Sequence, residues 1–484
     1  MTKVWQMAVL AAILAAVIMY PSRERMTLTT DGVNYLTSAE NIVRGRGAVN
    51  YTGQMELEHP PGYSYALAPF IKIGMNAQGA AFTVNWLSLI IVGVMAFMLL
   101  GDLTGKTDWR VTAGAVLVMA NPPLVMYANQ ILSEALCAAL VLSFLWLASR
   151  AAAATSKHWR WTVGTLLAGL ALCFTRYPGL AVVLGVGLCM RTWRDRAVVV
   201  LPPLILGALA ISVKVPSLFS LNNGRPGMAW HVTDGISTIV TGTLGVALLV
   251  YLVVKNWHSI TTRMMALQVL MYAGGLMASA MVFKIDPTLD LRLFTPISGV
   301  LYLMLIGLTI RHWRGFTSYV MAGLAYSLIL GVVSFWPWLS TSSGKILNDP
   351  AFMDSRAMSM IDSIPPTTDI YSTCPAAIYL KTGRVTKALT NTLYRDKQEV
   401  RADKDDPRKT GGYLIWFKRF NNGYLGPESY QDIMVSYGED KIAGYQDDVA
   451  LIVPVMKAVV DSLSASWMLR EIEKQTQVPR KAAQ

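Results

Sequence analysis

The stretch from residue 31 to residue 63 gathers ionisable side chains between apolar segments long enough to cross a bilayer. It opens with Asp31 and carries Glu56, Glu58 and His59 in its second half. Carboxylates and imidazoles are the side chains that most often move protons in catalysis. Ionisable groups beside a bilayer are costly to keep there, so their presence indicates function. We therefore expect this stretch to carry a catalytic site.

Asp31 has two interpretations. Residues 31–44 predict an interfacial helix whose apolar face is marked by Val33, Leu36 and Val43. Asp31 and Tyr35 share another face of this helix, where the carboxylate can act as a general base. Thr-Thr-Asp before a helix also predicts an N-cap, in which the carboxylate accepts from free backbone N–H groups. Both interpretations stay open, and one residue can serve both.

Three further groups are candidates to work beside Asp31. Glu58 and His59 precede Pro60-Pro61-Gly62-Tyr63, where the prolines stiffen the turn. Glu134 opens a predicted helix in the sequence NQILSE. The alternatives are an ordinary acidic loop for Glu58 and His59, and a favourable interaction with the helix dipole for Glu134. A divalent metal on His59 and nearby carboxylates is conceivable, but no second histidine is close, so no metal site is predicted.

Basic side chains on the same face are suited to a phosphate. Arg292 follows Asp290 in the sequence DLRLFTP, at the start of an apolar segment. A guanidinium fork donates two hydrogen bonds to one phosphate. The alternative is an arginine that snorkels to the interface. Weaker phosphate-binding candidates on this face are Arg176, Lys214 and Arg225.

The composition is that of a membrane protein with a modest soluble part. Of the 484 residues, 53% are hydrophobic and only 15% are charged, whereas about a quarter of the residues are charged in soluble domains. The net charge of +12 comes from short loops between apolar segments, and no basic run is interleaved with aromatics, so nucleic-acid binding is not predicted. The four cysteines form no CxxC motif, which argues against a cysteine zinc site.

Apolar segments predict an all-α polytopic bundle of about eleven membrane spans. They lie near 4–20, 80–100, 111–128, 131–149, 161–175, 178–191, 197–214, 236–254, 264–284, 293–310 and 317–338. Residues 161–191 are either two full spans or a broken re-entrant pair. With the N-terminus in the cytoplasm, every cytoplasmic loop is basic, as the positive-inside rule requires. The first loop (21–79), the candidate site residues and the C-terminal part then share the outer face.

The composition changes after Trp336-Pro-Trp338. We expect a transmembrane domain over 1–338 and a small soluble α/β domain over 339–484, with a disordered tail. Predicted strands lie at 369–373, 413–417 and 449–455, and predicted helices lie near 350–363, 374–381 and 456–473.

Four segments, in order, resemble motifs of the GT-C superfamily of polyprenyl-phosphate-sugar-dependent glycosyltransferases. They are DGVNYLTSAENIVRGRG (31–47), HPPGYSYALAPF (59–70), ILSEAL (131–136) and DLRLFTP (290–296). A fifth, IYSTCPAAIYLKTGR (370–384), is similar to the start of the soluble tail in bacterial members. The superfamily includes protein O-mannosyltransferases and lipid A aminoarabinose transferases. No single motif is specific, but the ordered set is.

The resemblance implies a function as well as a fold. It implies a bacterial inner-membrane enzyme with a cavity facing the periplasm and a donor sugar on undecaprenyl or a related polyprenyl phosphate. It implies that Asp31 is the catalytic base of an inverting transfer and that Arg292 holds the lipid phosphate. Tyr35, His59, Tyr63 and Asp290 would line the site. Glu58, Glu134 and Asp286 compete for the role of a second carboxylate.

Other functions remain open at this stage. A flippase or transporter for a lipid-linked sugar would also need a polar outer cavity, although no inverted repeat is evident. An O-antigen-type ligase would use a polyprenyl diphosphate donor instead. A membrane-anchored scaffold would not need about eleven spans. The sugar and the acceptor, whether glycan, lipid or protein, are not identified by the sequence.

Overall fold

The structure is a computed structural model, and it describes most of the chain up to residue 206 and shorter parts beyond. The described residues are 2–51, 53, 55, 59–154, 158–206, 250–251, 253–283, 295–312, 315, 318, 320–321, 323, 347, 353–362, 364–372, 374–388, 412–417, 445–446 and 450–455. The chain divides into two compact units. The first unit comprises Met1–Asn50 and Met55–Ile346, and the second comprises Tyr51–Gln54 and Leu347–Gln484.

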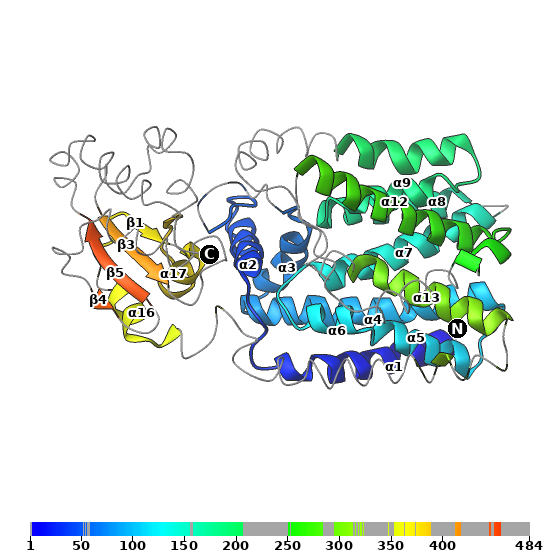
Figure 1. Ribbon diagram of the computed structural model, residues 1–484, viewed down its shortest axis with the longest axis horizontal. Coiled ribbons are helices and arrows are strands. Elements are labelled where there is room, and N and C mark those ends of the chain that lie inside the picture. Colours follow the sequence, from blue (N-terminus) through cyan, green and yellow to red (C-terminus); the bar gives the residue numbers. More distant parts are fainter. Residues whose placement is uncertain are drawn as a thin grey trace, which may run out of the picture. The chain divides into compact units, whose positions relative to one another are not determined.

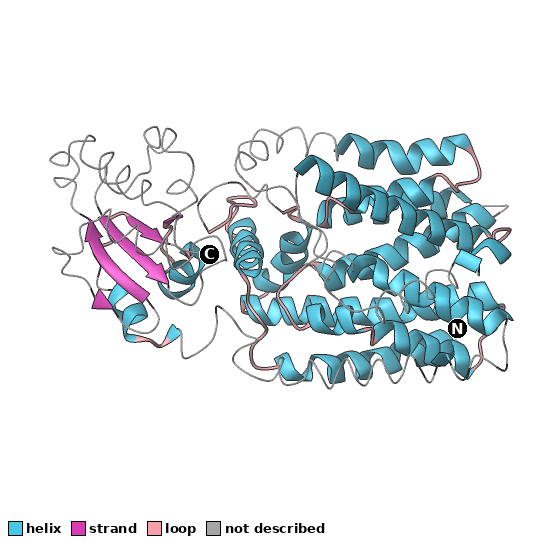
Figure 2. Ribbon diagram, in the orientation of Figure 1, coloured by secondary structure: helices cyan, strands magenta, loops and turns pink. Residues whose placement is uncertain are grey.

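Helices make up the described part of the first unit (Figures 1 and 2). Short elements at one end of it are η1 (Tyr20–Ser22), α2 (Thr30–Val43) and α3 (Gly62–Lys72). Further helices are α1 (Thr2–Met19), α4 (Ala77–Thr104), α5 (Trp109–Met119), α6 (Pro122–Ala128), α7 (Glu134–Ala153), α8 (His158–Thr175), α9 (Gly179–Gly187), α12 (Ile260–Phe283) and α13 (Thr295–His312). Residues 193–206 are also helical.

Several of these helices are long and apolar enough to cross a bilayer. Among the described residues they are Lys3–Ser22, α4 and α7, and the pair α5 and α6 forms one further candidate span that is bent by 53°. The bend occurs at Ala120–Asn121, before two prolines that cannot donate backbone hydrogen bonds. The predicted spans at 236–254 and 317–338, and the end of 197–214, lie largely outside the described residues. The structure thus supports a membrane protein, while the total of about eleven spans stays a prediction.

One end of the first unit collects the basic loops. The Lys3 ammonium donates to the Thr107 carbonyl at 3.0 Å, and Arg311 donates to the Leu103 carbonyl at 3.4 Å. Arg191 donates to the Ala154 carbonyl at 3.4 Å. These contacts join the start of α1 to the loop after α4, the end of α13 to the end of α4, and the segment after α9 to the end of α7. We call this the basic end: residues 2–5, 102–110, 150–160, 191–196, 255–258 and 311–312.

The opposite end of the same unit is built around a short extended contact. The Thr27 N–H donates to the Asn129 carbonyl at 3.2 Å, and the Ile131 N–H donates to the Thr27 carbonyl at 3.0 Å. The Ser22 hydroxyl donates to the same Asn129 carbonyl. We call this the site end: residues 20–35, 59–64, 129–135 and 174–179. The predicted alternation of loops between two ends holds for these described segments.

Two glycines allow the helices of the site end to approach closely. A Cβ on Gly32 would lie 2.9 Å from the Ile131 carbonyl oxygen, so only glycine lets α2 pack there. A Cβ on Gly62 would lie 2.5 Å from the Phe174 carbonyl oxygen. Gly62 therefore lets the start of α3 pack against the end of α8. The turn Arg176–Pro178 between α8 and α9 falls where the sequence interrupts the apolar run.

Helix α2 differs from the predicted interfacial helix in two respects. Its N-cap is Thr29, whose hydroxyl accepts from the Gly32 N–H at 3.2 Å. Asp31 lies one position into the helix, and its expected capping role is therefore taken by Thr29. The polar residues Asn34, Thr37 and Ser38 are buried, as are Val33 and Leu36, so both faces of α2 are covered.

The described part of the second unit is a small α/β fold. Its strands are β1 (Ile370–Ser372), β2 (Lys387–Ala388), β3 (Gly412–Phe417), β4 (Tyr445–Gln446) and β5 (Ala450–Val455), in the order β2-β1-β3-β5-β4. β1 is parallel to β2 and β3, and β5 is antiparallel to β3 and β4. The helices are α16 (Arg356–Ile361) and α17 (Pro375–Thr382). β1, β3, β5, α16 and α17 lie within one residue of the predicted segments or inside them, whereas the short strands β2 and β4 were not predicted. The helix predicted at 456–473 lies outside the described residues.

Two contacts hold local segments of the second unit. The Arg384 guanidinium donates to the carbonyls of Ile364, Pro365 and Thr368 at 2.7–2.9 Å and so holds the turn before β1. The tip of the first loop, Tyr51–Gln54, belongs to this unit. The rings of Tyr51 and Tyr379 lie 6.3 Å apart, so this tip packs on α17.

Candidate functional site

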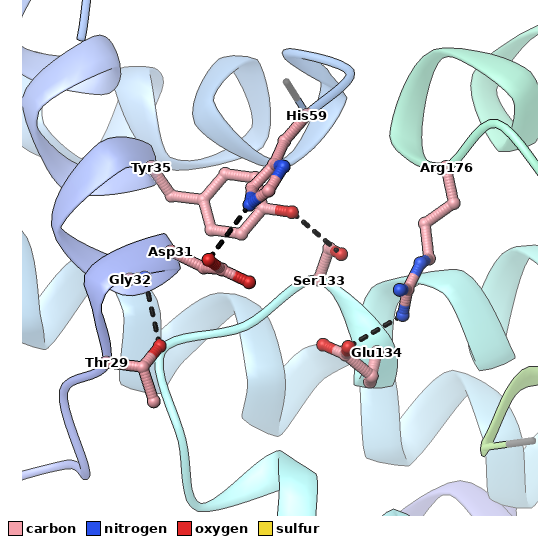
Figure 3. Close-up of polar contacts among 8 residues, drawn as sticks. All are labelled: Thr29, Asp31, Gly32, Tyr35, His59, Ser133, Glu134 and Arg176. Atoms are coloured by element: carbon pink, nitrogen blue, oxygen red, sulfur yellow. Dashed lines mark hydrogen bonds and ion pairs between the residues drawn. The ribbon is translucent and has the colours of Figure 1, made fainter. Parts of the chain in front are cut away.

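The first turn of α2 presents Asp31 to a histidine from the end of the first loop. His59 Nε2 lies 3.1 Å from Asp31 Oδ1, and the two side chains are 17% and 26% exposed (Figure 3). The carboxylate is thus held in place yet reachable. When the imidazole is protonated, this contact is an ion pair that helps to hold the carboxylate. Sequence analysis placed both residues in the site, and the structure brings them together.

Tyr35 lies one helical turn after Asp31 and closes the site from the side. Its ring centroid is 5.4 Å from that of His59 and 5.1 Å from that of Tyr63, which meets it edge-on. The Tyr35 and Ser133 hydroxyl oxygens are 3.3 Å apart (Figure 3). Three of the predicted lining residues therefore form one aromatic cluster around the carboxylate.

Tyr63 supports the site through a buried hydrogen bond. Its hydroxyl donates to Asn85 Oδ1 at 3.0 Å, and the Asn85 amide donates to the carbonyls of Ala128 and Gln130. Burial raises the pKa of the Tyr63 hydroxyl well above its ordinary value. Tyr63 thus stays a hydrogen-bond donor and anchors the segment that carries Ser133.

Glu134 and Arg176 form a buried ion pair. Arg176 NH1 lies 2.6 Å from Glu134 Oε1, with the two side chains 13% and 0% exposed (Figure 3). The sequence suggested separate roles, a second carboxylate and a phosphate ligand. The structure instead places them on each other, between the start of α7 and the turn after α8. Breaking a buried pair by removing one partner costs about 3–5 kcal/mol, because a buried charge loses its counter-charge.

These contacts form one continuous cluster from α2 to the turn after α8. Ser133 touches Tyr35, and its chain neighbour Glu134 touches Arg176. Ser133, Asn85 and Thr29 escaped the sequence analysis. Asn85 had a visible signal, since it is a polar residue inside an apolar span. Ser133 and Thr29 had weaker signals, because hydroxyl residues before helices usually serve only as caps.

Several predicted residues lie outside the described residues. They are Glu56, Glu58, Lys214, Arg225, Asp286, Asp290 and Arg292. Within the residues that the structure describes, no three His, Cys, Asp or Glu side chains gather where they could hold a metal ion.

Comparison with known proteins was informative only at the level of structure. No protein-family model matches the sequence, and no curated protein matches it. Two solved structures of ArnT from Cupriavidus metallidurans do match. The form bound to undecaprenyl phosphate gives a TM-score of 0.58 at 13% identity, over 92% of this chain and 97% of that chain. The apo form gives 0.52 at 14% identity, over 93% and 98%.

A third structure, the oligosaccharyltransferase of Archaeoglobus fulgidus, matches with a TM-score of 0.49 at 10% identity, over 92% of this chain and 72% of that chain. The chain has the fold of ArnT along nearly its whole length. The likeness to the solved structures is one of fold.

Proposed function

We propose that the chain is an integral-membrane glycosyltransferase of the inverting GT-C type. It moves a sugar from a polyprenyl-phosphate donor to an acceptor hydroxyl at the outer, periplasmic face of the bacterial inner membrane. One observation carries the proposal: a partly exposed carboxylate, Asp31, is held by His59 in a fold shared with a protein solved with undecaprenyl phosphate. A fold alone does not determine a reaction, so the assignment depends on the carboxylate of Asp31.

Asp31 acts as the general base in this proposal. The acceptor hydroxyl gives its proton to the carboxylate as its oxygen attacks the anomeric carbon from the side opposite the phosphate. The bond from that carbon to the phosphate oxygen breaks with its electron pair, and the configuration inverts. A positioned base contributes about 10²–10⁴-fold to such a step. No nucleotide is required, since the lipid phosphate is itself the leaving group.

His59 and Tyr35 keep Asp31 ready for this step. The 3.1 Å contact with His59 holds one carboxylate oxygen, which leaves the other for the acceptor. Tyr35 packs on the imidazole and limits its rotation. His59 is therefore a positioning residue, and its loss should lower turnover more than donor binding.

The leaving phosphate needs positive charge at the same end. Arg176 lies there and is paired with Glu134. It could bind a phosphate either with its remaining N–H groups, while the ion pair stays intact, or by releasing Glu134. Arg292, Lys214 and Arg225 remain the other proposed phosphate ligands. Stabilising charge that develops on the leaving group is a major source of catalysis. Glu58 stays proposed as a second catalytic carboxylate, and Asp290 stays proposed as a lining residue.

A transfer assay with the purified full chain tests this function. Radiolabelled polyprenyl-phosphate sugars are supplied one at a time, with a membrane extract from the source cell as acceptor. We expect label to move with the wild type and to fall at least about 100-fold with Asp31→Asn. Glu40→Gln is the matched control, because Glu40 is a carboxylate of the same helix that pairs only with Arg44 on the surface.

Near-normal transfer by Asp31→Asn would remove Asp31 from the mechanism. Transfer from a polyprenyl diphosphate donor alone would instead identify an O-antigen-type ligase. Label that crosses the bilayer of liposomes without transfer would identify a flippase and reject the enzyme.

A further inference from the structure

Trp-Arg dipeptides recur at the basic end. Trp109-Arg110 opens α5, Trp159-Arg160 lies in the first turn of α8, and Trp193-Arg194 opens the helix over 193–206. A fourth, Trp313-Arg314, follows α13 outside the described residues. The proposed transfer reaction uses none of them, since it takes place at the other end of the bundle.

The three described pairs share one geometry. The guanidinium carbon of each arginine lies 5.7–5.8 Å from the centre of the neighbouring tryptophan ring. The three tryptophans are 59–73% exposed. Each pair therefore presents a flat apolar ring and a positive charge side by side at the surface.

Among the described residues, no carboxylate balances these charges. No ion pair involves Arg110, Arg160 or Arg194 among the described residues, whereas Arg150 at the same end binds Asp102 at 2.7 Å. A positive charge in the first turn of a helix also opposes the helix dipole. The three arginines thus cost some helix stability, which an external anion would offset.

The tryptophans continue exposed apolar stripes. Trp159 is followed at helical spacing by exposed Val163 and Leu167 on α8. Trp193 is followed by exposed Leu201 and Ile205. Exposed apolar stripes in a membrane protein are suited to acyl chains, and tryptophan is enriched where such stripes reach the water interface. The Trp159 and Trp193 pairs therefore suit headgroup depth, and the Trp109 pair lies at the same end of the unit, which favours a lipid over a soluble partner.

We propose that the Trp109-Arg110, Trp159-Arg160 and Trp193-Arg194 pairs bind the headgroups of anionic phospholipids at the basic end. The guanidinium donates to the lipid phosphate, and the indole lies against the glycerol and the upper acyl chain. A basic residue near an anionic surface contributes about 1 kcal/mol, so each pair should favour an anionic over a zwitterionic lipid about fivefold.

Native mass spectrometry of the full chain tests this surface. The purified protein is incubated with equal amounts of phosphatidylglycerol and phosphatidylcholine, and the retained lipids are counted. We expect the wild type to retain phosphatidylglycerol preferentially, and the triple variant R110Q/R160Q/R194Q to lose that preference at least about fivefold. Arg23→Gln is the matched control, since Arg23 lies 4.1 Å from the Tyr20 ring at the site end and should leave the preference unchanged.

Three outcomes would overturn the proposal. They are equal retention of both lipids by the wild type, an unchanged preference in the triple variant, and displacement of phosphatidylglycerol by excess inorganic phosphate, which would indicate a site for free phosphate. If the triple variant does not insert into the membrane, the single variants R110Q, R160Q and R194Q take its place. Each is expected to retain one phosphatidylglycerol fewer, and wild-type retention by all three would reject the proposal.

Discussion

At the site end, Arg176 is almost fully buried and lies 2.6 Å from the carboxylate of Glu134. At the basic end, Arg110, Arg160 and Arg194 lie over neighbouring indoles with no carboxylate partner among the described residues. Arginine thus makes an ion pair within the protein at the site end. At the basic end its proposed partner is a lipid headgroup. Net charge alone hides this difference, because it counts both kinds of arginine equally.

The largest expected contrast comes from the carboxylates that pair with arginine at each end. Glu134→Gln leaves Arg176 buried without its counter-charge and should destabilise the protein by about 3–5 kcal/mol. Asp102→Asn breaks the pair between Asp102, which is 28% exposed, and Arg150, which is 42% exposed. This loss should cost less than about 1 kcal/mol. Chemical unfolding in mixed micelles measures both. Equal losses of unfolding free energy in the two variants would contradict the difference in burial between the two ion pairs.

Glycines at the two ends should also respond differently. Gly62→Ala places a methyl group 2.5 Å from the Phe174 carbonyl oxygen, so α3 must shift, at about 1–3 kcal/mol. Gly101→Ala on α4 meets nothing closer than 3.4 Å and should be neutral or stabilising, because alanine favours helices. We expect only Gly62→Ala to lower transfer as well. A Gly62→Ala protein as stable and active as the wild type would show that this close approach is not required.

The smallest expected effect comes from replacing the N-cap residues of two helices. Thr29 caps α2 and Asp108 caps α5, each by one side-chain bond to a backbone N–H. Either change to alanine should cost about 1 kcal/mol. Thr29→Ala should in addition lower the rate of transfer, since Asp31 stands in the turn that Thr29 closes, whereas Asp108→Ala should leave the rate unchanged. The transfer assay on both variants tests this difference. An equal loss of transfer rate in the two variants would count against a local role for Thr29.

Local patterns predicted much of this fold. The helix expected at 31–44 occurs at Thr30–Val43, and the strand expected at 413–417 occurs at Gly412–Phe417. The exact cap of α2 was not predictable, because Thr29, Thr30 and Asp31 are all capable of it. The structure selects Thr29 through the extended contact of Thr27 with residues 129–131, which keeps the chain out of the helix until that point.

The site was predictable in its residues more than in their partners. Asp31 and His59 lie in one loop, so their proximity could be anticipated. Glu134 and Arg176 are 42 positions apart, and their pairing depends on how α7 and α8 pack. Buried contacts of that kind are decided by tertiary structure, which short motifs do not encode.

The route of the first loop has a consequence for protein engineering. The chain leaves the helical unit after Asn50, contributes Tyr51–Gln54 to the second unit, and returns at Met55, four positions before His59. The second unit is therefore not an appendage that can be cut off or exchanged at one junction. A chimaera that swaps only the segment after residue 346 would set a foreign surface against the native Tyr51. Functional grafts should carry residues 51–54 together with the domain.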